Sequence, residues 1–187
     1  MWPSFLFGLY NFFDGMRFGS AMKNELDLRT MSEEEVMMLF YDASCIVTSD
    51  RWKACWMVAI ACLESGYGQH YIDHNVVGYH YVDGMGWEYV TAKEGMTGKQ
   101  RKYRKFNSFA DCFKSLLYLL DKSQATKEYV ASRKIDTSTI SGRKKRIRKF
   151  SEGYCPMDKS HADKVYSIYV RVIALVNQIY GDETIIA

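Results

Sequence analysis

Several long segments of this chain repeat apolar positions with the period of an α-helix. Ser32-Glu33-Glu34-Glu35 has the spacing of a capping box, and apolar residues follow it at helical spacing to about residue 47. Similar capped segments begin at Ser108 and at Ser160, and the second continues to Gly181. Shorter helices are expected over 126–134 and 143–150. The pattern therefore predicts a mostly helical chain.

One segment is apolar on every face rather than on one. Trp52–Leu63 contains a single charged residue, Lys53, and follows Thr48-Ser49-Asp50, a favourable N-cap cluster. A helix of this composition lies in the middle of a domain, and it is too short to span a bilayer. Gly66 and Gly68 predict that the helix ends directly after Glu64.

Residues 75–106 change to short runs that are rich in β-branched and aromatic residues. Val76–Val82 and Trp87–Thr91 flank the glycine-rich turn Asp83–Gly86, which predicts a β-hairpin, and Arg101–Phe106 would add a third strand. A small β-lobe is therefore expected between helices. The fold class that follows is α+β, mostly helical, with a central buried helix.

The composition is that of one folded domain. The chain has 187 residues, of which 48% are apolar and 25% are charged, so it can bury a core of ordinary size. Its apolar N-terminus lacks the positive segment and cleavage site of a secretion signal, so we expect synthesis in the cytosol. We expect an N-terminal extension of unknown role over 1–30, a domain over 31–181 and a tail over 182–187; the oligomeric state is left open.

The charge is unevenly distributed along the chain. The formal net charge is +3, but residues 1–50 contain three basic and eight acidic residues, so the remainder carries +8. Basic runs at 99–105 and 143–149 suit a polyanion, either nucleic acid or an anionic cell-wall polymer. A solvated helix face is the alternative interpretation.

Neither the cysteines nor the histidines predict a metal site. The five cysteines form no C-x-x-C pair, which indicates neither a disulfide framework nor a zinc site. His70 and His74 stand four apart, with His80 nearby, but the segment lacks the H-E-x-x-H pattern and its glycines disfavour a helix. We expect no metal.

Glu64 is the first candidate for catalysis. At the C-terminal end of a buried helix, desolvation and the helix dipole both oppose ionisation of a carboxyl group, which favours a proton donor. The alternative is that Glu64 is merely the first exposed residue where the helix emerges. Aromatic residues that stack on sugars, or that simply build a core, follow it: Tyr67, Tyr71, Tyr79, Tyr81, Trp87 and Tyr89.

Four motifs then occur in a familiar order. The stretch Leu63–Gln69, followed by Asn75–Gly78, resembles the "LESGWGxS … NxFGIK" signature of glycoside hydrolase family 73, the glucosaminidases of autolysins, flagellar peptidoglycan hydrolases and phage lysins. Tyr103–Phe109 is similar to the family's "FRKYxSFxxSF" segment, and Gly153–Asp158 to its "GYATDPxYAxKL" motif. Together the motifs cover about residues 33–180.

The resemblance implies a lysozyme-like fold and a catalytic pair. It implies that Glu64 is the general acid of a hydrolase that cleaves β-1,4 bonds of peptidoglycan glycan strands after N-acetylglucosamine, with no cofactor. A second acidic residue assists water or stabilises the transition state. Thr91-Ala92-Lys93-Glu94 fits the family's "TxxE" segment, which favours Glu94, with Asp83 and Glu88 as alternatives.

The resemblance also suggests the substrate-binding residues. Tyr154 matches the tyrosine that lines the family's sugar-binding cleft, and the rest of the predicted set is Tyr67, Asn75, Gly78 and Trp87. The sequence departs from the family at His161, which stands where the motif has its second tyrosine, and at Val77, which replaces a phenylalanine or leucine. These departures bear on substrate contacts more than on the acid.

Three alternatives for the function stay open. A muramidase and a lytic transglycosylase cleave the same polymer with a similar helix-borne acid, and a non-catalytic module would bind wall polymers or nucleic acid by charge alone. We expect peptidoglycan rather than nucleic acid as the partner. A phage lysin, a virion-associated enzyme or an effector exported by a dedicated system would suit a wall-acting chain without a secretion signal.

Overall fold

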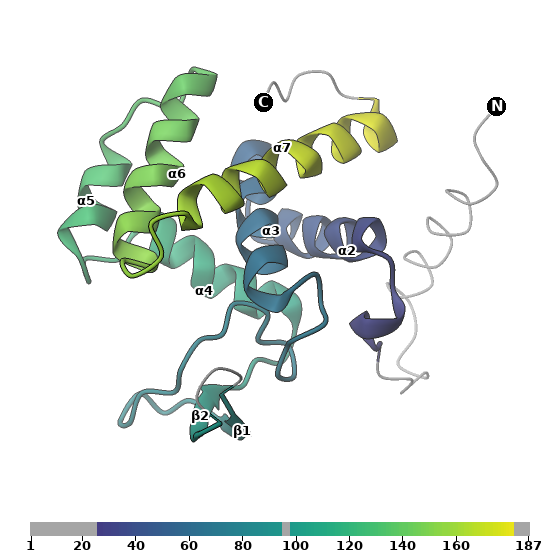
Figure 1. The fold of residues 1–187 in the computed structure, drawn as a ribbon, viewed down its shortest axis with the longest axis vertical. Helices are drawn as coiled ribbons and strands as arrows, with labels where there is room; N and C mark the ends of the chain where they lie inside the picture. The colour runs from purple at the N-terminus through teal and green to yellow at the C-terminus, as the bar shows by residue number, and fades with distance from the viewer. Residues whose placement is uncertain (1–25, 95–97, 182–187) are drawn as a thin grey trace.

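Six α-helices and one two-stranded antiparallel sheet form the part of the chain that the computed structural model describes, residues 26–94 and 98–181. A short 3-10 helix, η1, precedes them. The helices form one body, and the sheet with the loop before it forms a lobe at one end of this body (Figure 1). In chain order the elements are η1 (Leu28–Thr30), α2 (Glu33–Cys45), α3 (Arg51–Ser65), β1 (Tyr89–Lys93), β2 (Gln100–Arg104), α4 (Phe109–Asp121), α5 (Lys127–Arg133), α6 (Ile140–Tyr154) and α7 (His161–Tyr180).

Helix α3 is the central helix that the sequence predicts. Every residue from Ala54 to Cys62 is fully buried, and α3 packs against both α2 and α7. Burial on all sides explains why a helix without an amphipathic pattern is stable here. The helix ends at Gly66, whose φ of +55° is a left-handed conformation that glycine adopts without steric cost.

Two of the four predicted N-caps, Ser32 and Ser108, make the expected side-chain bond, whereas Asp50 at the start of α3 makes none. At α2, the N–H of Ser32 donates to Oε2 of Glu35 (2.7 Å) and the N–H of Glu35 donates to Oγ of Ser32 (3.3 Å), which completes the capping box. Ser108 accepts from the N–H of Asp111 at the start of α4. Ser160 makes no such side-chain bond at α7. The basic segment predicted as a short helix over 143–150 is the middle of the longer α6.

The predicted hairpin around residues 83–86 is wrong in its pairing. Strand β1 pairs with β2, so the antiparallel pair consists of Tyr89–Lys93 and Gln100–Arg104 and not of the segments on either side of the glycines of 83–86. The segment around Tyr79 and Tyr81, which precedes the glycines, lies along the other edge of β2. The N–H of Tyr81 donates to the carbonyl of Lys102 (3.0 Å), and the N–H of Arg104 donates to the carbonyl of Tyr79 (2.9 Å). A local glycine-rich turn signal cannot specify how a strand pairs with segments farther along the chain.

The described part of the N-terminal extension joins the core. Leu28 is fully buried, and its Cβ would lie 2.7 Å from a Cβ added at Gly68. This contact requires glycine at position 68 and ties η1 to the turn after α3. Most of the predicted extension, residues 1–25, and the tail lie outside the described residues, so the predicted domain boundaries stay predictions.

No helix in the described ranges is both long enough and apolar enough to cross a membrane.

Candidate active site

The turn after α3 is built by Ser65, which the sequence reasoning did not single out. The side chain of Ser65 is buried; its hydroxyl donates to the carbonyl of Ala61 (2.6 Å) and accepts from the N–H of Gly68 (3.0 Å). The N–H of Tyr67 donates to the carbonyl of Cys62 (2.8 Å), which closes the helix end. These bonds fix the backbone on both sides of Glu64, so its side chain leaves the helix in a defined direction.

Glu64 contacts a residue from the far end of the chain. Its Oε1 lies 3.1 Å from Nε2 of His161, the first residue of α7 and 97 residues away in sequence. The side chain of His161 is 4% exposed and that of Glu64 is 30% exposed. The packing of α3 on α7 brings the two together. Glu64 is therefore accessible to a ligand while one of its oxygens has a buried partner.

Tyr154, at the end of α6, lies beside this pair and links it to the lobe. Its ring centroid is 5.5 Å from that of His161, and its hydroxyl donates to the carbonyl of Val77 (3.3 Å). Burial raises the pKa of the Tyr154 phenol well above its usual value, and the nearby carboxylate of Glu64 raises it further. Tyr154 is therefore a neutral hydrogen-bond donor at the junction of α3, α6, α7 and the lobe.

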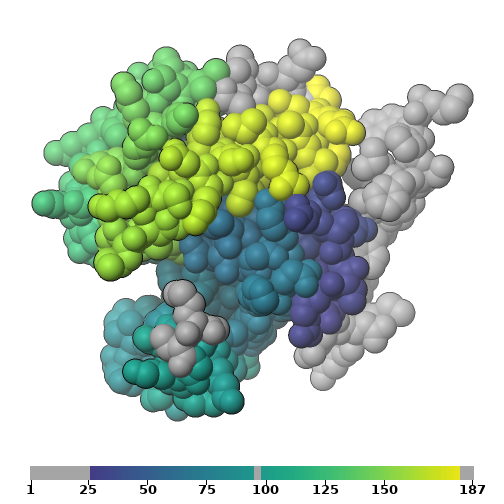
Figure 2. Space-filling model, viewed as in Figure 1, coloured from purple at the N-terminus to yellow at the C-terminus, as the bar shows by residue number. Residues whose placement is uncertain are grey.

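The surface is hollowed between the lobe and the helical body. Figure 2 shows a notch that separates the lobe from the N-terminal end of α7. The contacts of Glu64, His161 and Tyr154 come from the elements that border this notch. The predicted binding cleft at the end of the central helix stays a prediction.

Asn75 and Gly78 shape the loop that enters the lobe. Asn75 is 3% exposed; its Nδ2 donates to the carbonyls of Tyr79 (2.8 Å) and Arg104 (2.9 Å), and its Oδ1 accepts from the N–H of Tyr79 (2.9 Å). These bonds give Asn75 a structural role, and its predicted contact with sugar stays a prediction. Gly78 has a φ of +68°, and a Cβ added there would meet no atom within 4 Å, so space is open above this residue.

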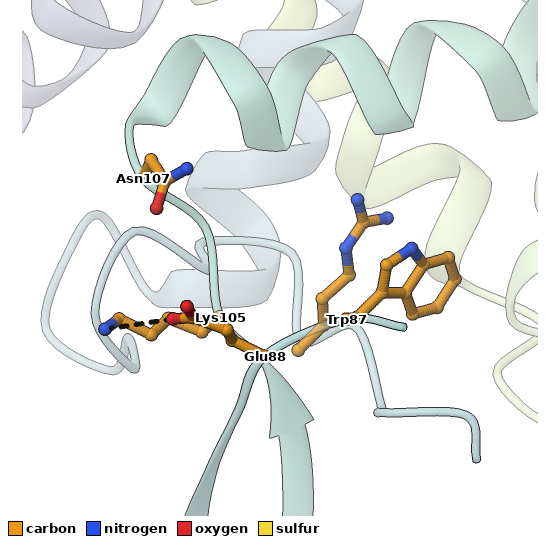
Figure 3. Close-up of a pocket in the computed structure, with 5 residues that line it drawn as sticks. Trp87, Glu88, Lys105 and Asn107 are labelled. Carbon is orange, nitrogen blue, oxygen red and sulfur yellow. Dashed lines mark ion pairs between the residues drawn. The ribbon is translucent and has the colours of Figure 1, made fainter. Parts of the chain in front are cut away.

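Trp87 lines a small open hollow on the lobe. The hollow has a volume of about 140 Å³ and is lined by Trp87, Glu88, Arg104, Lys105 and Asn107. The guanidinium of Arg104 lies 4.0 Å from the centre of the Trp87 ring, a cation–π contact that fixes the indole. Trp87 points to the opposite side from the ion pair between Glu88 and Lys105 (Figure 3), as expected for neighbouring residues in extended chain.

Each of the three candidates for the second acid has a basic neighbour in the lobe. Oε1 of Glu94 lies 2.9 Å from Nε of Arg101, and the Glu94 side chain is 20% exposed. Glu88 is 76% exposed and lies 3.4 Å from Lys105, whereas Asp83 is 91% exposed and lies 3.9 Å from Lys102. Glu94 is thus the most enclosed of the three carboxylates and has the shortest ion pair.

Tyr67 faces the helical body. Its hydroxyl accepts from Nη1 of Arg171 (2.8 Å), and the same arginine forms an ion pair with Glu33 (2.7 Å). Burial raises the pKa of the Tyr67 phenol. Tyr67 therefore links the turn after α3 to α7 and α2, and its predicted role in binding substrate stays a prediction.

Comparisons with known proteins identify the fold. The glycoside hydrolase domain of Salmonella typhimurium FlgJ superposes with a TM-score of 0.64 at 17% identity, over 80% of this chain and 94% of that domain. A peptidoglycan hydrolase mutant from Sphingomonas sp. A1 has a TM-score of 0.56 at 16% identity, over 78% and 99% of the two chains. The catalytic domain of the Listeria monocytogenes autolysin Auto has 0.52 at 15%, over 91% and 96%.

The chain has a lysozyme-like glycoside hydrolase fold. The predicted fold class, α+β and mostly helical with a central buried helix and a small β-lobe, is confirmed. No family model matches the sequence, and no curated protein matches it closely enough to be recognised as a relative. At the identities found, the likeness to solved structures is one of fold.

On this glycoside hydrolase fold, most residues of the two basic runs have partners within the protein. Arg146 is buried and donates to Oδ1 of Asp121 (3.0 Å). Arg148 pairs with Asp163 and Lys149 with Glu152. The other run makes the ion pairs and cation–π contacts of the lobe described above. Much of the charge that suggested a polyanion is therefore engaged in contacts within the protein.

The histidines near the turn have separate surroundings. Nδ1 of His74 lies 3.1 Å from the carbonyl oxygen of Phe106 and 3.0 Å from Asp73, whereas the ring of His80 packs on Tyr103 at 5.2 Å. In the described ranges, no three His, Cys, Asp or Glu side chains gather in a way that would hold a metal ion.

Proposed function

We propose that this chain is a peptidoglycan hydrolase that cleaves the β-1,4 bond after N-acetylglucosamine in glycan strands. The observation that supports this most is Glu64, a partly exposed carboxyl group at the end of the buried helix α3, at the junction with the lobe. The superposed structures are described as a glycoside hydrolase domain, a peptidoglycan hydrolase and an autolysin. The motifs around Glu64 support the same reading, while the phage or exported setting stays a prediction.

Glu64 is the general acid in this proposal. Its carboxyl group gives a proton to the glycosidic oxygen as the bond between that oxygen and the anomeric carbon breaks. The oxygen of a water molecule forms the new bond to the anomeric carbon, and the proton that this water loses passes to a carboxylate. One water is consumed for each bond cleaved, and no cofactor takes part.

Glu94 is the carboxylate to which we assign the second role, either to assist the attack of water or to stabilise the developing positive charge. Its ion pair with Arg101 favours the charged form, which suits a base and does not suit an acid. Its low exposure gives it a more defined position than the exposed Glu88 and Asp83. Substitution of each by its amide tests the choice, and Glu94→Gln is expected to lower kcat most, by about 100-fold. An equal or larger loss in Glu88→Gln or Asp83→Asn would move the role to that residue.

The sugar contacts are assigned to residues of the lobe, of the loop that enters it and of the end of α6. Trp87 offers an indole face that Arg104 holds in place, and aromatic faces stack on sugar rings. Gly78 leaves space for a ring to approach the backbone, and Tyr154 lies beside the acid. Tyr67 and Asn75 also belong to the predicted substrate-binding set. Their hydrogen bonds within the protein give them a structural role in addition.

The first experiment is Glu64→Gln, which keeps the size of the side chain and removes the acid. We expect release of reducing ends from purified cell walls to fall about 1,000-fold or more, with the thermal unfolding midpoint close to that of the wild type. Glu152→Gln is the matched control, because Glu152 is exposed on α6 and paired with Lys149. Retained activity in Glu64→Gln would overturn the proposal.

Mass spectrometry of the released fragments tests the bond. A new reducing end on N-acetylglucosamine is the expected product. A reducing end on N-acetylmuramic acid would assign a muramidase, and an anhydro sugar a lytic transglycosylase. Binding to walls that weakens steeply with salt, without any cleavage, would assign a binding module instead.

A further inference from the structure

The contact between Glu64 and His161 gives the proposed acid a fixed partner. The His161 ring lies against Tyr154, and the backbone N–H of His161 donates to the carbonyl of Asp158 (3.2 Å). With 4% of its side chain exposed, the ring has little room to rotate. Nε2 therefore stays directed at Oε1 of Glu64, at 3.1 Å.

The surroundings of the other ring nitrogen indicate which tautomer is present. Nδ1 of His161 is buried, and no group in the described ranges forms a hydrogen bond with it. A proton on Nδ1 would bury an N–H without an acceptor, and a doubly protonated ring would bury a charge as well, which are both costly. We assign the neutral ring with its proton on Nε2 from this hydrogen-bond pattern.

The groups that surround the His161 ring are consistent with a neutral tautomer protonated on Nε2. Glu64 approaches it from α3 and the neutral phenol of Tyr154 from α6. The side chain of Asp158, in the turn before α7, accepts instead from Ser160 (2.6 Å) and Lys164 (2.8 Å). Glu64 is thus the carboxylate that meets the His161 ring.

We propose that His161 is a positioning residue for Glu64 and that it determines which oxygen of the acid carries the catalytic proton. This proposal rests on the proposed function. A protonated carboxyl group has one hydroxyl and one carbonyl oxygen. Because Oε1 accepts from Nε2–H of His161, Oε1 is the carbonyl oxygen and the proton is on Oε2.

The same hydrogen bond acts after the proton has left. When Oε2 has given its proton to the glycosidic oxygen, Nε2–H of His161 stabilises the resulting carboxylate and keeps its plane unchanged. His161 neither gives nor receives the proton. The histidine that departs from the family's tyrosine at this position thus acts on the acid itself, whereas the sequence alone related the departure to substrate contacts.

Two substitutions distinguish the loss of the Nε2–H donor of His161 from the loss of its ring. His161→Phe keeps a ring and removes Nε2–H, while His161→Gln places an amide N–H at about the reach of Nε2. We expect His161→Phe to lower kcat on soluble glycan-strand fragments about 10-fold to 50-fold with little change in KM. We expect the basic limb of its kcat–pH profile to move up by about 1 pH unit, because the carboxylate loses a donor.

His161→Gln is expected to restore kcat to within about 5-fold of the wild type and to restore the pH profile. The thermal unfolding midpoint of each variant is measured alongside, so that a loss of folded protein is not counted as a loss of rate. A wild-type kcat and pH profile in His161→Phe would overturn the proposal. So would His161→Gln if it were folded and as defective as His161→Phe.

Nitrogen NMR of the histidine rings tests the pair without any substrate. We expect a protonated Nε2 and an unprotonated Nδ1 in His161 at neutral pH, and a shift of the Nε2 signal in Glu64→Gln with the signals of His80 unchanged. A proton on Nδ1 would overturn the proposal. Absence of glycan cleavage by the wild type would instead overturn the proposed function, whatever the NMR shows of His161.

Discussion

The central helix and the β-lobe place their functional side chains by different means. Helix α3 holds Glu64 at the end of a segment in which every residue from Ala54 to Cys62 is fully buried. The lobe carries Trp87 before and Glu94 directly after β1, a strand whose residues alternate between exposed and half-buried. The proposed acid is therefore on the well-packed part of the molecule, and its partners are on a part with little core of its own.

Polar and cation–π contacts replace apolar burial in the lobe. Asn75 joins two of its segments through three hydrogen bonds. Arg104 lies over Trp87, and the ammonium of Lys102 lies 4.5 Å from the centre of the Tyr89 ring. Regions with few buried apolar contacts open at a lower free energy than the core. The comparison teaches that the proposed acid is held by a well-packed core, whereas the lobe is the part of the molecule that adjusts more readily.

Removal of one tryptophan from each region gives the largest expected contrast. Trp56 is fully buried in α3, with its ring 5.5 Å from that of Trp52 and 5.3 Å from that of Phe150. We expect Trp56→Ala to lower the free energy of unfolding by about 3–5 kcal/mol, because it leaves a large cavity. Trp87→Ala is expected to lower it by less than about 1 kcal/mol and to reduce kcat/KM instead. Denaturant unfolding and initial rates measure the two effects, and a similar loss of stability in both variants would contradict the comparison.

The same contrast explains what could be predicted from the sequence. The capping box at Ser32, the buried helix and its end at Gly66 are local patterns, and the structure confirms each of them. The pairing of β1 with β2 is not local: the turn signal at 83–86 suggested a different hairpin, and contacts with the other edge of β2 decide the arrangement.

The residues of the candidate site also differ in whether a local pattern in the sequence could predict them. Glu64 and Tyr154 could be chosen from their motifs, because each motif is contiguous. The approach of His161 to Glu64 across 97 residues depends on how α7 packs on α3, which no spacing in the sequence shows. The link from Tyr67 through Arg171 to Glu33 was missed for the same reason. The departure at His161 was the one signal in the sequence that marked this position.

Asn75→Ala tests whether the lobe depends on its polar anchor, and its expected effect is intermediate. The substitution removes the three bonds of Asn75 and leaves the carbonyls of Tyr79 and Arg104 without this partner. We expect a loss of about 2 kcal/mol, and hydrogen exchange at the Tyr79 amide should accelerate more than exchange in α3. Asn107→Ala is the matched control, since Asn107 is exposed. Unchanged exchange at Tyr79 would show that the lobe is held by other contacts.

The smallest expected effect belongs to the ion pair between Glu88 and Lys105. The two charged atoms are 3.4 Å apart, with 76% of the Glu88 side chain and 42% of the Lys105 side chain exposed, so water and salt screen their attraction. We expect Lys105→Ala to change the free energy of unfolding by less than about 0.5 kcal/mol, and a double-mutant cycle with Glu88→Ala to give a similarly small coupling that disappears in high salt.

A coupling above about 1 kcal/mol would mean that surface charge holds the lobe. The backbone also joins these residues, because the N–H of Lys105 donates to the carbonyl of Glu88 (3.0 Å), and this bond survives both substitutions. A small coupling together with a large effect of Asn75→Ala would therefore attribute the stability of the lobe to its buried amide. Glu88 would then contribute nothing to stability. The effect of Glu88→Gln on kcat could therefore be compared directly with the effect of Glu94→Gln.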